Sequence, residues 1–254
     1  MTVAAPARLR VDRAGRVRHR IGLGEISNDL AGWIADDLIA TGRLDPAAFE
    51  STFVSIVESV ADDPVAAWTA FYRNTLTGLA AGGTPGGTNA GMAPVHARAA
   101  ALATGSVVEL GCCFGFLSLR LAAAGHRVTA VDLSPGTVRL LAAVAPAVRV
   151  RLTAVAGDAL AVPLAADSAD TLFAVHLLEH LPPGADATVV GEMLRVARQR
   201  VVVAVPYEDE PNAAWGHVRT FDAAALDRLG AGTGRRYRVA DHHGGWLVVD
   251  AGRG

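Results

Sequence analysis

The chain of 254 residues contains no lysine, and all 23 of its basic residues are arginine. The absence of lysine excludes a Schiff-base enzyme, a P-loop with its phosphate-binding lysine and any lysine general base. The 27 glycines and the many alanines, together with arginine in place of lysine, are typical of a GC-rich genome. Any catalysis must therefore rest on other side chains.

Cysteine is scarce as well, because only Cys112 and Cys113 occur. Adjacent cysteines are poorly placed for an ordinary structural disulfide, so we expect a reducing compartment. No hydrophobic run approaches the length of a membrane span, and the arginine-rich N-terminal segment is not followed by an apolar secretory core. The sequence predicts a soluble, cytoplasmic protein without a membrane partner.

Neither sign of charge dominates, since 23 basic residues stand against 25 acidic ones and the net charge is −2. This balance gives no reason to expect a nucleic-acid partner. The hydrophobic content of 51% suffices for a sizeable core. Partners must therefore be inferred from candidate sites.

The N-terminal third predicts a small hairpin followed by helices, which we treat as an extension covering residues 1–81. Alternating apolar and basic residues at 9–21, around Asp12 to Gly15, predict the hairpin. Helices are expected at 28–41, 45–60 and 64–81, and Asp45 followed by Pro46 is typical of a helix start.

Residues 82–94, GGTPGGTNAGMAP, predict a flexible linker or a lid loop because glycine and proline are dense there. From residue 95 to 254, strand and helix patterns alternate. Strands are expected near 106–110, 127–132, 148–156, 170–175, 199–205, 235–240 and 245–249, and helices near 94–103, 115–124, 135–144, 186–197 and 222–229. The alternation predicts an α/β fold with a mostly parallel sheet, covered on both faces and closed by an antiparallel pair.

The segment VVELGCCFGFLSLRLA, residues 107–122, combines a buried strand, a turn with glycines and an amphipathic helix. Gly111 and Gly115 allow the backbone to come close to a ligand at the carboxyl end of the strand. The helix offers free amides and the positive end of its dipole to a carboxylate. The segment therefore predicts a nucleotide-type binding loop, with Glu109 at the end of its strand.

The next predicted strand ends in Asp132, about 20 residues after Gly111, the first glycine of the loop. This is the spacing at which an acid binds ribose hydroxyls in doubly wound sheets. The alternative role for Asp132 is a cap on the helix that Ser134 and Pro135 open.

These residues resemble the class I S-adenosylmethionine (SAM)-dependent methyltransferases, whose first motif is an acidic residue followed by Gly-x-Gly-x-Gly. The resemblance covers residues 105 to about 250 and implies a Rossmann-like fold with SAM as cofactor. Cys113 stands where the middle glycine usually lies. A dinucleotide enzyme matches less well, because Gly-x-Gly-x-x-Gly would also require glycine at Cys113 and Phe116.

The resemblance also implies which residues contact the cofactor. An acidic residue after the third strand bonds the adenine amino group in that family, which points to Asp158, and Ala159 offers its backbone amide. The fourth strand leads into His176, and this segment lines the methyl-transfer cleft. The expected cofactor residues are Glu109, Gly111, Cys113, Gly115, Asp132, Leu133, Asp158, Ala159 and His176.

The run HLLEH, residues 176–180, also fits the His-x-x-Glu-His signature of inverted zinc proteases. That site requires a long helix carrying both histidines, whereas this run follows a strand directly and meets Pro182 and Pro183. We therefore disfavour proteolysis and assign no metal ligands. A purely structural role, with one histidine packed and one solvated, stays open.

The predicted catalytic residues are His180, His217 and Glu179, which would together deprotonate an acceptor hydroxyl. His180 and His217 are the possible bases, because imidazole titrates near neutrality, and Glu179 or an acid at 208–210 would orient them. His176 is a further possible base. A solvated loop is the alternative reading of the acidic run at 208–210.

Taken as a whole, with GLGEISNDL at 22–30 and VELGCCFGF at 108–116, the sequence resembles the actinobacterial mycofactocin oligosaccharide methyltransferases. That resemblance implies O-methylation of a sugar hydroxyl on the glucose oligomer of mycofactocin, a peptide-derived redox cofactor. Trp33, Trp68, Tyr72 and Trp215 would offer stacking faces, although core packing is expected for at least two of them. The alternatives are a methyltransferase for another small natural product and a SAM-binding regulator without catalysis.

Overall fold

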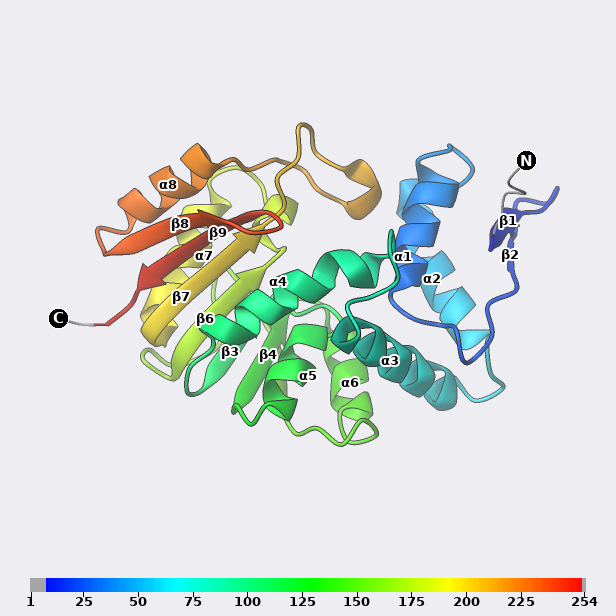
Figure 1. Ribbon diagram of the computed structural model, residues 1–254, viewed down its shortest axis with the longest axis horizontal. Coiled ribbons are helices and arrows are strands. Elements are labelled where there is room, and N and C mark those ends of the chain that lie inside the picture. The colour runs from blue at the N-terminus through cyan, green and yellow to red at the C-terminus, as the bar shows by residue number, and fades with distance from the viewer. Residues whose placement is uncertain (1–7, 253–254) are drawn as a thin grey trace. The chain divides into compact units, whose positions relative to one another are not determined.

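The computed structural model describes residues 8–252, so residues 1–7 of the predicted extension and 253–254 of the predicted cofactor domain lie outside the description. The chain forms two compact units (Figure 1). The first comprises Met1–Ala93 with Ala213–Gly216, and the second comprises Pro94–Asn212 with His217–Gly254. A short segment far along the sequence thus joins the N-terminal unit.

The N-terminal unit begins with the predicted hairpin, in which β1 (Leu9–Val11) pairs antiparallel with β2 (Val17–His19). Its helices are α1 (Asp29–Ile34), continued by a π-helical turn at Ala35–Ile39, α2 (Phe49–Glu58) and α3 (Pro64–Ala80). The predicted cap at Asp45 is confirmed, because its side chain accepts a hydrogen bond from the amide of Ala47 at 2.8 Å.

Aromatic side chains form the core of this unit. Phe53, Trp68, Phe71 and Tyr72 pack on one another, with edge-to-face contacts of 5.4 to 5.6 Å between ring centroids. Trp68 and Tyr72 are buried, so they act as core residues rather than as exposed stacking faces. The half-buried Trp33 carries the guanidinium of Arg8 over its ring at 4.4 Å.

The predicted linker at 82–94 is wrong in its second half, because α4 (Thr88–Leu102) begins inside it. The carboxylate of Asp29 accepts a hydrogen bond from the amide of Asn89 at 2.8 Å and so fixes the first turn of the helix. Pro94 lies within α4, where glycine and proline signals alone predict a loop. The loop before the helix retains positive φ at Gly83 and Gly86.

The second unit is built on a seven-stranded sheet in the order β5-β4-β3-β6-β7-β9-β8. Its strands are β3 (Val107–Leu110), β4 (Val128–Asp132), β5 (Thr153–Ala156), β6 (Ala169–Val175), β7 (Ala197–Val205), β8 (Tyr237–Asp241) and β9 (Gly245–Asp250). The predicted strand at 148–156 is shorter than expected, since residues 148–152 are not in β5.

Strands β5, β4, β3, β6 and β7 are parallel, whereas β9 pairs antiparallel with both β7 and β8. The predicted α/β class, with a mostly parallel sheet and an antiparallel closing pair, is therefore confirmed. Strand β3 is buried throughout and β6 is buried except at Asp170, because helices cover both faces of the sheet. Parallel pairing also brings the carboxyl ends of β3, β4, β5, β6 and β7 to one edge of the sheet.

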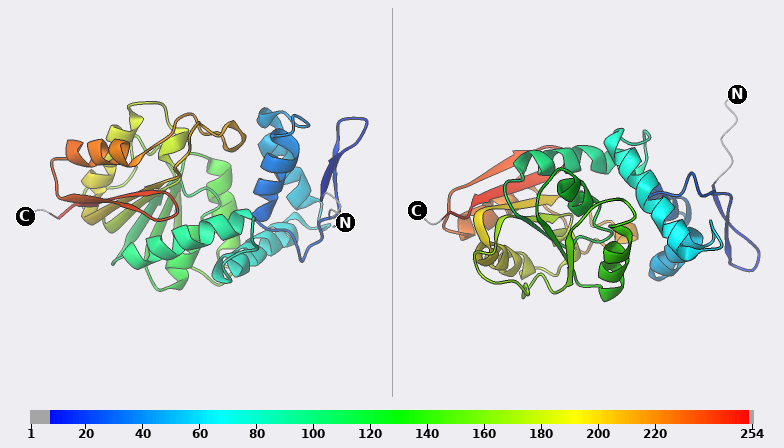
Figure 2. Two further views of the ribbon diagram at one scale, coloured as in Figure 1. Left: turned by 45° about the horizontal axis from the view of Figure 1, so that its top comes forward. Right: turned by 90° about the horizontal axis from the view of Figure 1, so that it is seen from below.

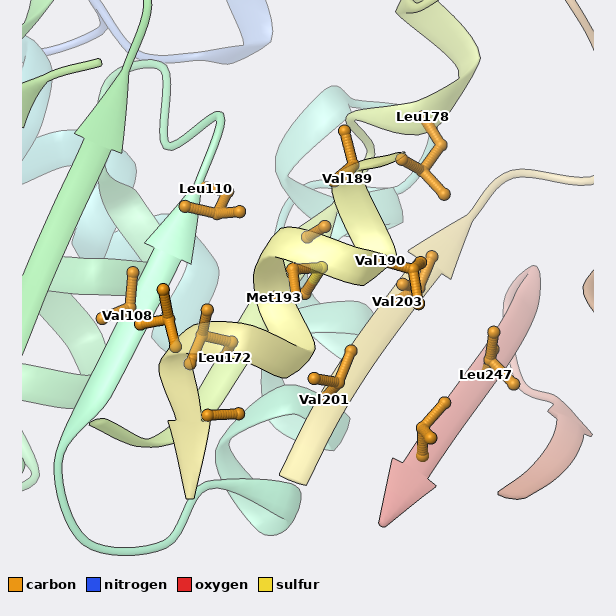
Figure 3. Packing of buried hydrophobic residues seen from close by; sticks show 14 of the residues in the cluster. Val108, Leu110, Leu172, Leu178, Val189, Val190, Met193, Val201, Val203 and Leu247 are labelled. Carbon is orange, nitrogen blue, oxygen red and sulfur yellow. The ribbon is translucent and has the colours of Figure 1, made fainter. Parts of the chain in front are cut away.

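Helices α4, α5 (Phe116–Ala123) and α6 (Pro135–Val144) accompany one face of the sheet, and α7 (Ala185–Val196) and α8 (Ala223–Gly232) accompany the other (Figure 2). Figure 3 shows the core beneath α7, where Val189 and Met193 meet side chains from β3, β6 and β7. Leu178, just past the end of β6, lies near Val189 in this core. The core thereby anchors the turn that follows β6.

Candidate functional site

The loop after β3 depends on residues in the left-handed region of φ. Gly111 has a φ of 67°, and a Cβ placed on it would lie 2.7 Å from a methyl carbon of Leu177. Gly115, at the start of α5, has a φ of 72° and equally lacks room for a Cβ beside Leu141. Cys113 has a φ of 48°, so a cysteine adopts here a conformation that favours glycine.

Asp132, at the carboxyl end of β4, is tied to this loop. One of its carboxylate oxygens accepts a hydrogen bond from the amide of Cys113 at 2.8 Å, and the other accepts one from the amide of Ser134 at 2.9 Å. The capping position of α6 belongs to Ser134, whose hydroxyl accepts a hydrogen bond from the amide of Thr137. The alternative role of Asp132 as the cap of α6 is therefore excluded.

Glu109 lies within the fold rather than at its edge, since only 5% of its surface is exposed. The hydroxyl of Ser118 on α5 donates a hydrogen bond to its carboxylate. Burial raises the pKa of Glu109 to about 7, against the lowering effect of that hydrogen bond, and the charge of Asp132 adds to the increase. Glu109 thus links β3 to α5 beneath the glycine loop.

Beyond the neighbouring strand β5, the exposed Asp158 accepts a hydrogen bond from the amide of Leu160 at 2.8 Å. The half-buried Ala159 lies between them. Leu133 is 73% exposed and Leu160 is 37% exposed, both next to the carboxyl ends of adjacent parallel strands.

The run HLLEH follows β6 and does not form a long helix. His176 has a φ of 53°, in the left-handed region, and Leu178–His180 is a single 3-10 turn. The zinc-protease arrangement is therefore excluded, as the sequence pattern had indicated. The turn directs Leu178 into the core and leaves Glu179 and His180 at the carboxyl edge of the sheet.

His217 comes from a distant segment and joins this turn. The amide of Val218 donates a hydrogen bond to the carbonyl of Glu179 at 2.9 Å, which ties the two segments together. The rings of His180 and His217 meet edge to face with centroids 4.9 Å apart. Nδ1 of His217 lies 2.7 Å from a carboxylate oxygen of Glu208.

All three catalytic candidates therefore meet, since one possible ligand atom each from Glu179, His180 and His217 lies within 4.8 Å of the others. The predicted orienting acid is Glu208 among residues 208–210. The sequence did not predict that these three residues form a cluster able to bind a metal, because His217 is far from Glu179 in sequence.

Burial dominates the electrostatics of the turn. It raises the pKa of Glu179 to about 8, and the nearby charge of Glu208 adds to the increase. It lowers the pKa of His176 to about 4, with further lowering by His217 and His180, so His176 is neutral near pH 7. Nδ1 of His176 lies 3.4 Å from a carboxylate oxygen of Glu179.

Sequence reasoning missed two features near this edge. His96 on α4 is buried, and burial together with the charges of Arg120 and His176 lowers its pKa to about 3. A lone histidine in an alanine-rich helix gives no signal of this position. Arg219 pairs with Asp186 on α7 at 3.2 Å and lies over the ring of Phe221, and the sequence gives no signal of either contact.

Residues 107–200, from β3 into β7, match the family model described as a methyltransferase domain. The second unit therefore contains a methyltransferase domain, and the chain is a SAM-dependent methyltransferase. None of the curated proteins compared with the methyltransferase matches it in sequence. No helix within residues 8–252 is long and apolar enough to cross a membrane.

Several solved structures share the fold. Magnesium protoporphyrin IX methyltransferase from Synechocystis PCC 6803 with bound SAM is 18% identical with a TM-score of 0.51, over 64% of this chain and 79% of that one. A protein from Pyrococcus horikoshii OT3 is 16% identical with a TM-score of 0.52, over 64% and 89%. A structure from work on the conversion of a disulfide bond into a thioacetal group during echinomycin biosynthesis is 20% identical with a TM-score of 0.52, over 62% and 81%.

The residues of the methyltransferase fit its cofactor, SAM. Gly111 and Gly115 have no Cβ, and a Cβ at these positions would clash with Leu177 and Leu141. Their backbone therefore stays accessible between the end of β3 and the first amides of α5, which can bind the carboxylate of SAM. Asp132 is held at the carboxyl end of β4, the strand next to β3. The strand order reverses between β3 and β6, and doubly wound sheets bind nucleotides at the carboxyl edge beside such a reversal.

Proposed function

We propose that this methyltransferase is an O-methyltransferase that acts on a sugar hydroxyl of the oligoglucose chain of mycofactocin. The observation that carries O-methylation is the meeting of two imidazoles, His180 and His217, with two carboxylates, Glu179 and Glu208, at the carboxyl edge of the sheet. The resemblance of the whole sequence to mycofactocin oligosaccharide methyltransferases supports the acceptor.

The proposed SAM site extends over the ends of β3, β4, β5 and β6. Asp132 would accept hydrogen bonds from the ribose hydroxyls, and Leu133 would cover one face of the adenine ring. Asp158 and the amide of Ala159 would bind the edge of that ring. The full set is Glu109, Gly111, Cys113, Gly115, Asp132, Leu133, Asp158, Ala159 and His176.

Bound SAM supplies a methyl group activated on a sulfonium, so the acceptor oxygen gains the methyl carbon, sulfur keeps the pair of the broken bond and the hydroxyl proton is released. A sugar hydroxyl is a weak acid, and the protein must promote this proton loss. Glu208 accepts a hydrogen bond from Nδ1–H of His217, and in the neutral ring this tautomer leaves the lone pair on Nε2. His180 and His217 are therefore the groups that promote deprotonation of the acceptor.

The proposal is tested by incubating the purified protein with SAM and glucose oligomers and following methyl gain by mass spectrometry. We expect transfer by the wild type, strong loss in His217→Asn, and retention in His126→Asn, a histidine before β4 at the opposite edge of the sheet. The acceptor assignment fails if no oligosaccharide gains a methyl group.

Two alternatives would give different results. Another small natural product as acceptor would gain the methyl group where glucose oligomers do not, and the fold shared with the protein from echinomycin biosynthesis favours testing this class. A SAM-binding regulator would bind SAM, transfer nothing, and keep its biological effect when His176, His180 and His217 are all replaced.

A further inference from the structure

A buried carboxylate without a hydrogen-bond partner lies within the proposed catalytic edge. Glu179 is 1% exposed, and neither of its side-chain oxygens has such a partner within the described part of the chain. A carboxylate removed from water costs several kcal/mol unless a positive charge or donors compensate it. A cation bound beside Glu179 would compensate the charge of its carboxylate.

The side chains beside Glu179 leave its oxygens without a donor. Nδ1 of His176 lies 3.4 Å from one of these oxygens and makes no hydrogen bond to it. Glu208, which contacts His217, is another acid. Glu179 has instead two imidazoles beside it, whose neutral nitrogens are ligands for metal ions.

We propose that Glu179, His180 and His217 bind one divalent transition-metal ion at the carboxyl edge of the sheet. One ligand atom from each residue lies within 4.8 Å of the others. Some point then lies within about 2.8 Å of all three atoms, so side-chain shifts below about 1 Å reach the ~2.1 Å of a zinc–nitrogen bond. Two imidazoles and one carboxylate favour Zn²⁺, Mn²⁺ or Fe²⁺ over Mg²⁺ or Ca²⁺.

Glu208 completes the arrangement because its carboxylate contacts His217, one of the proposed ligands. Histidines that bind metals usually donate their other ring N–H to a carboxylate, which fixes the tautomer and makes the ligand nitrogen more basic. His217 has this partner, with Nδ1 2.7 Å from Glu208. The Nε2 atom is then the nitrogen available to the ion.

The role of the ion rests on the proposed function, whereas its binding does not. Three protein ligands leave at least one coordination position open, as in catalytic rather than structural metal sites. A sugar hydroxyl in that position would lose its proton to solvent more readily, because a bound divalent ion strongly lowers the pKa of a coordinated oxygen acid. His180 and His217 would thus promote deprotonation as ligands of the ion.

The test uses untagged, full-length protein treated with a chelator and then titrated with Zn²⁺ by calorimetry, with Co²⁺ absorption as a spectroscopic readout. We expect one equivalent of Zn²⁺ and a Co²⁺ spectrum of nitrogen and oxygen ligands. Glu179→Gln, His180→Asn and His217→Asn should each weaken binding about 10-fold or more, whereas His126→Asn and Glu210→Gln should not. Circular dichroism checks that each variant is folded.

Equal Zn²⁺ affinity in the wild type and the three ligand variants would overturn the proposal, as would the absence of binding. SAM titrations of the same samples keep the two proposals separate. Intact SAM binding and methyl transfer in metal-free protein would refute the role of the ion in the transfer and leave the proposed function standing. Zinc binding that depends on the three ligands, without methyl transfer to any oligosaccharide, would refute the acceptor and leave the ion standing.

Discussion

Nδ1 of His217 lies 2.7 Å from the carboxylate of Glu208, which joins two segments at the carboxyl edge of the sheet. Glu208→Gln keeps an acceptor for the ring N–H but removes its charge. We expect kcat to fall about 10- to 100-fold, because the second partner of a functional histidine sets its basicity. The KM for SAM should hardly change, since Glu208 is outside the proposed cofactor site.

The matched control is Glu210→Gln, which changes an exposed acid of the same loop. Steady-state kinetics of both variants show whether the loss of kcat is specific to Glu208. Equal kcat values in the two variants would mean that Glu208 does not act through His217.

Leu177 and Gly111 are packed so closely that the glycine is required. In Gly111→Ala, the new Cβ would lie 2.7 Å from a methyl carbon of Leu177, and a φ of 67° would strain the alanine by about 1 kcal/mol. We expect a lower melting temperature and weaker SAM binding. Adding Leu177→Ala should relieve the clash but not the backbone strain.

Thermal denaturation of the single and double variants measures this coupling. The double variant should lose less stability than the sum of the two single losses. Strict additivity would contradict the proposed steric contact.

The buried carboxyl of Glu109 makes stability depend on pH. Its pKa is raised from 4.5 to about 7 in the folded protein, so the folded state retains a proton that the unfolded state releases. The proton on Glu109 adds roughly 3 kcal/mol to the free energy of unfolding. This stabilisation is fully present below about pH 4.5 and is lost as the pH rises toward 7.

Urea denaturation of the wild type and Glu109→Gln between pH 5 and 8 tests this dependence, at roughly one-unit steps. The variant should lose less stability than the wild type as the pH rises, because its amide does not ionise. Parallel stability curves would contradict the raised pKa.

Leu178 connects the core to the site, because it packs in the cluster beneath α7 and precedes Glu179 and His180 directly. Leu178→Ala should cost about 2–5 kcal/mol of stability, and so should Leu172→Ala in the same cluster. Only Leu178→Ala should also lower methyl transfer at a temperature where both variants are folded. Equal activities would show that the turn keeps its position without this anchor.

The sequence predicts most of the fold because its signals are local. Alternating strands and helices, the Asp45 cap and the closing antiparallel pair all follow from neighbouring residues. The predicted linker is too long at its C-terminal end. The hydrogen bond between Asp29 and Asn89 fixes the start of α4, and it cannot be predicted from local signals because these residues are far apart in sequence.

The same limit applies to the site. Gly111, Asp132 and the spacing between them are readable from the sequence, because the loop and the strand end belong to one repeating pattern. The meeting of Glu179, His180 and His217 depends on the tertiary fold, and the burial of Glu179 has no sequence signal. Chemistry that depends on desolvation was therefore visible only in the structure.

The measurement that tests the central claim most directly is calorimetric titration of the purified protein with SAM, alongside S-adenosylhomocysteine and NAD. The variant is Asp132→Ala, and the matched control is Asp250→Ala. Asp250 also ends a strand and accepts a hydrogen bond from the amide two residues later, but it lies at the opposite edge of the sheet. We predict micromolar SAM binding that Asp132→Ala loses and Asp250→Ala retains. Binding of NAD in place of SAM, or SAM binding that survives in Asp132→Ala, would contradict the account.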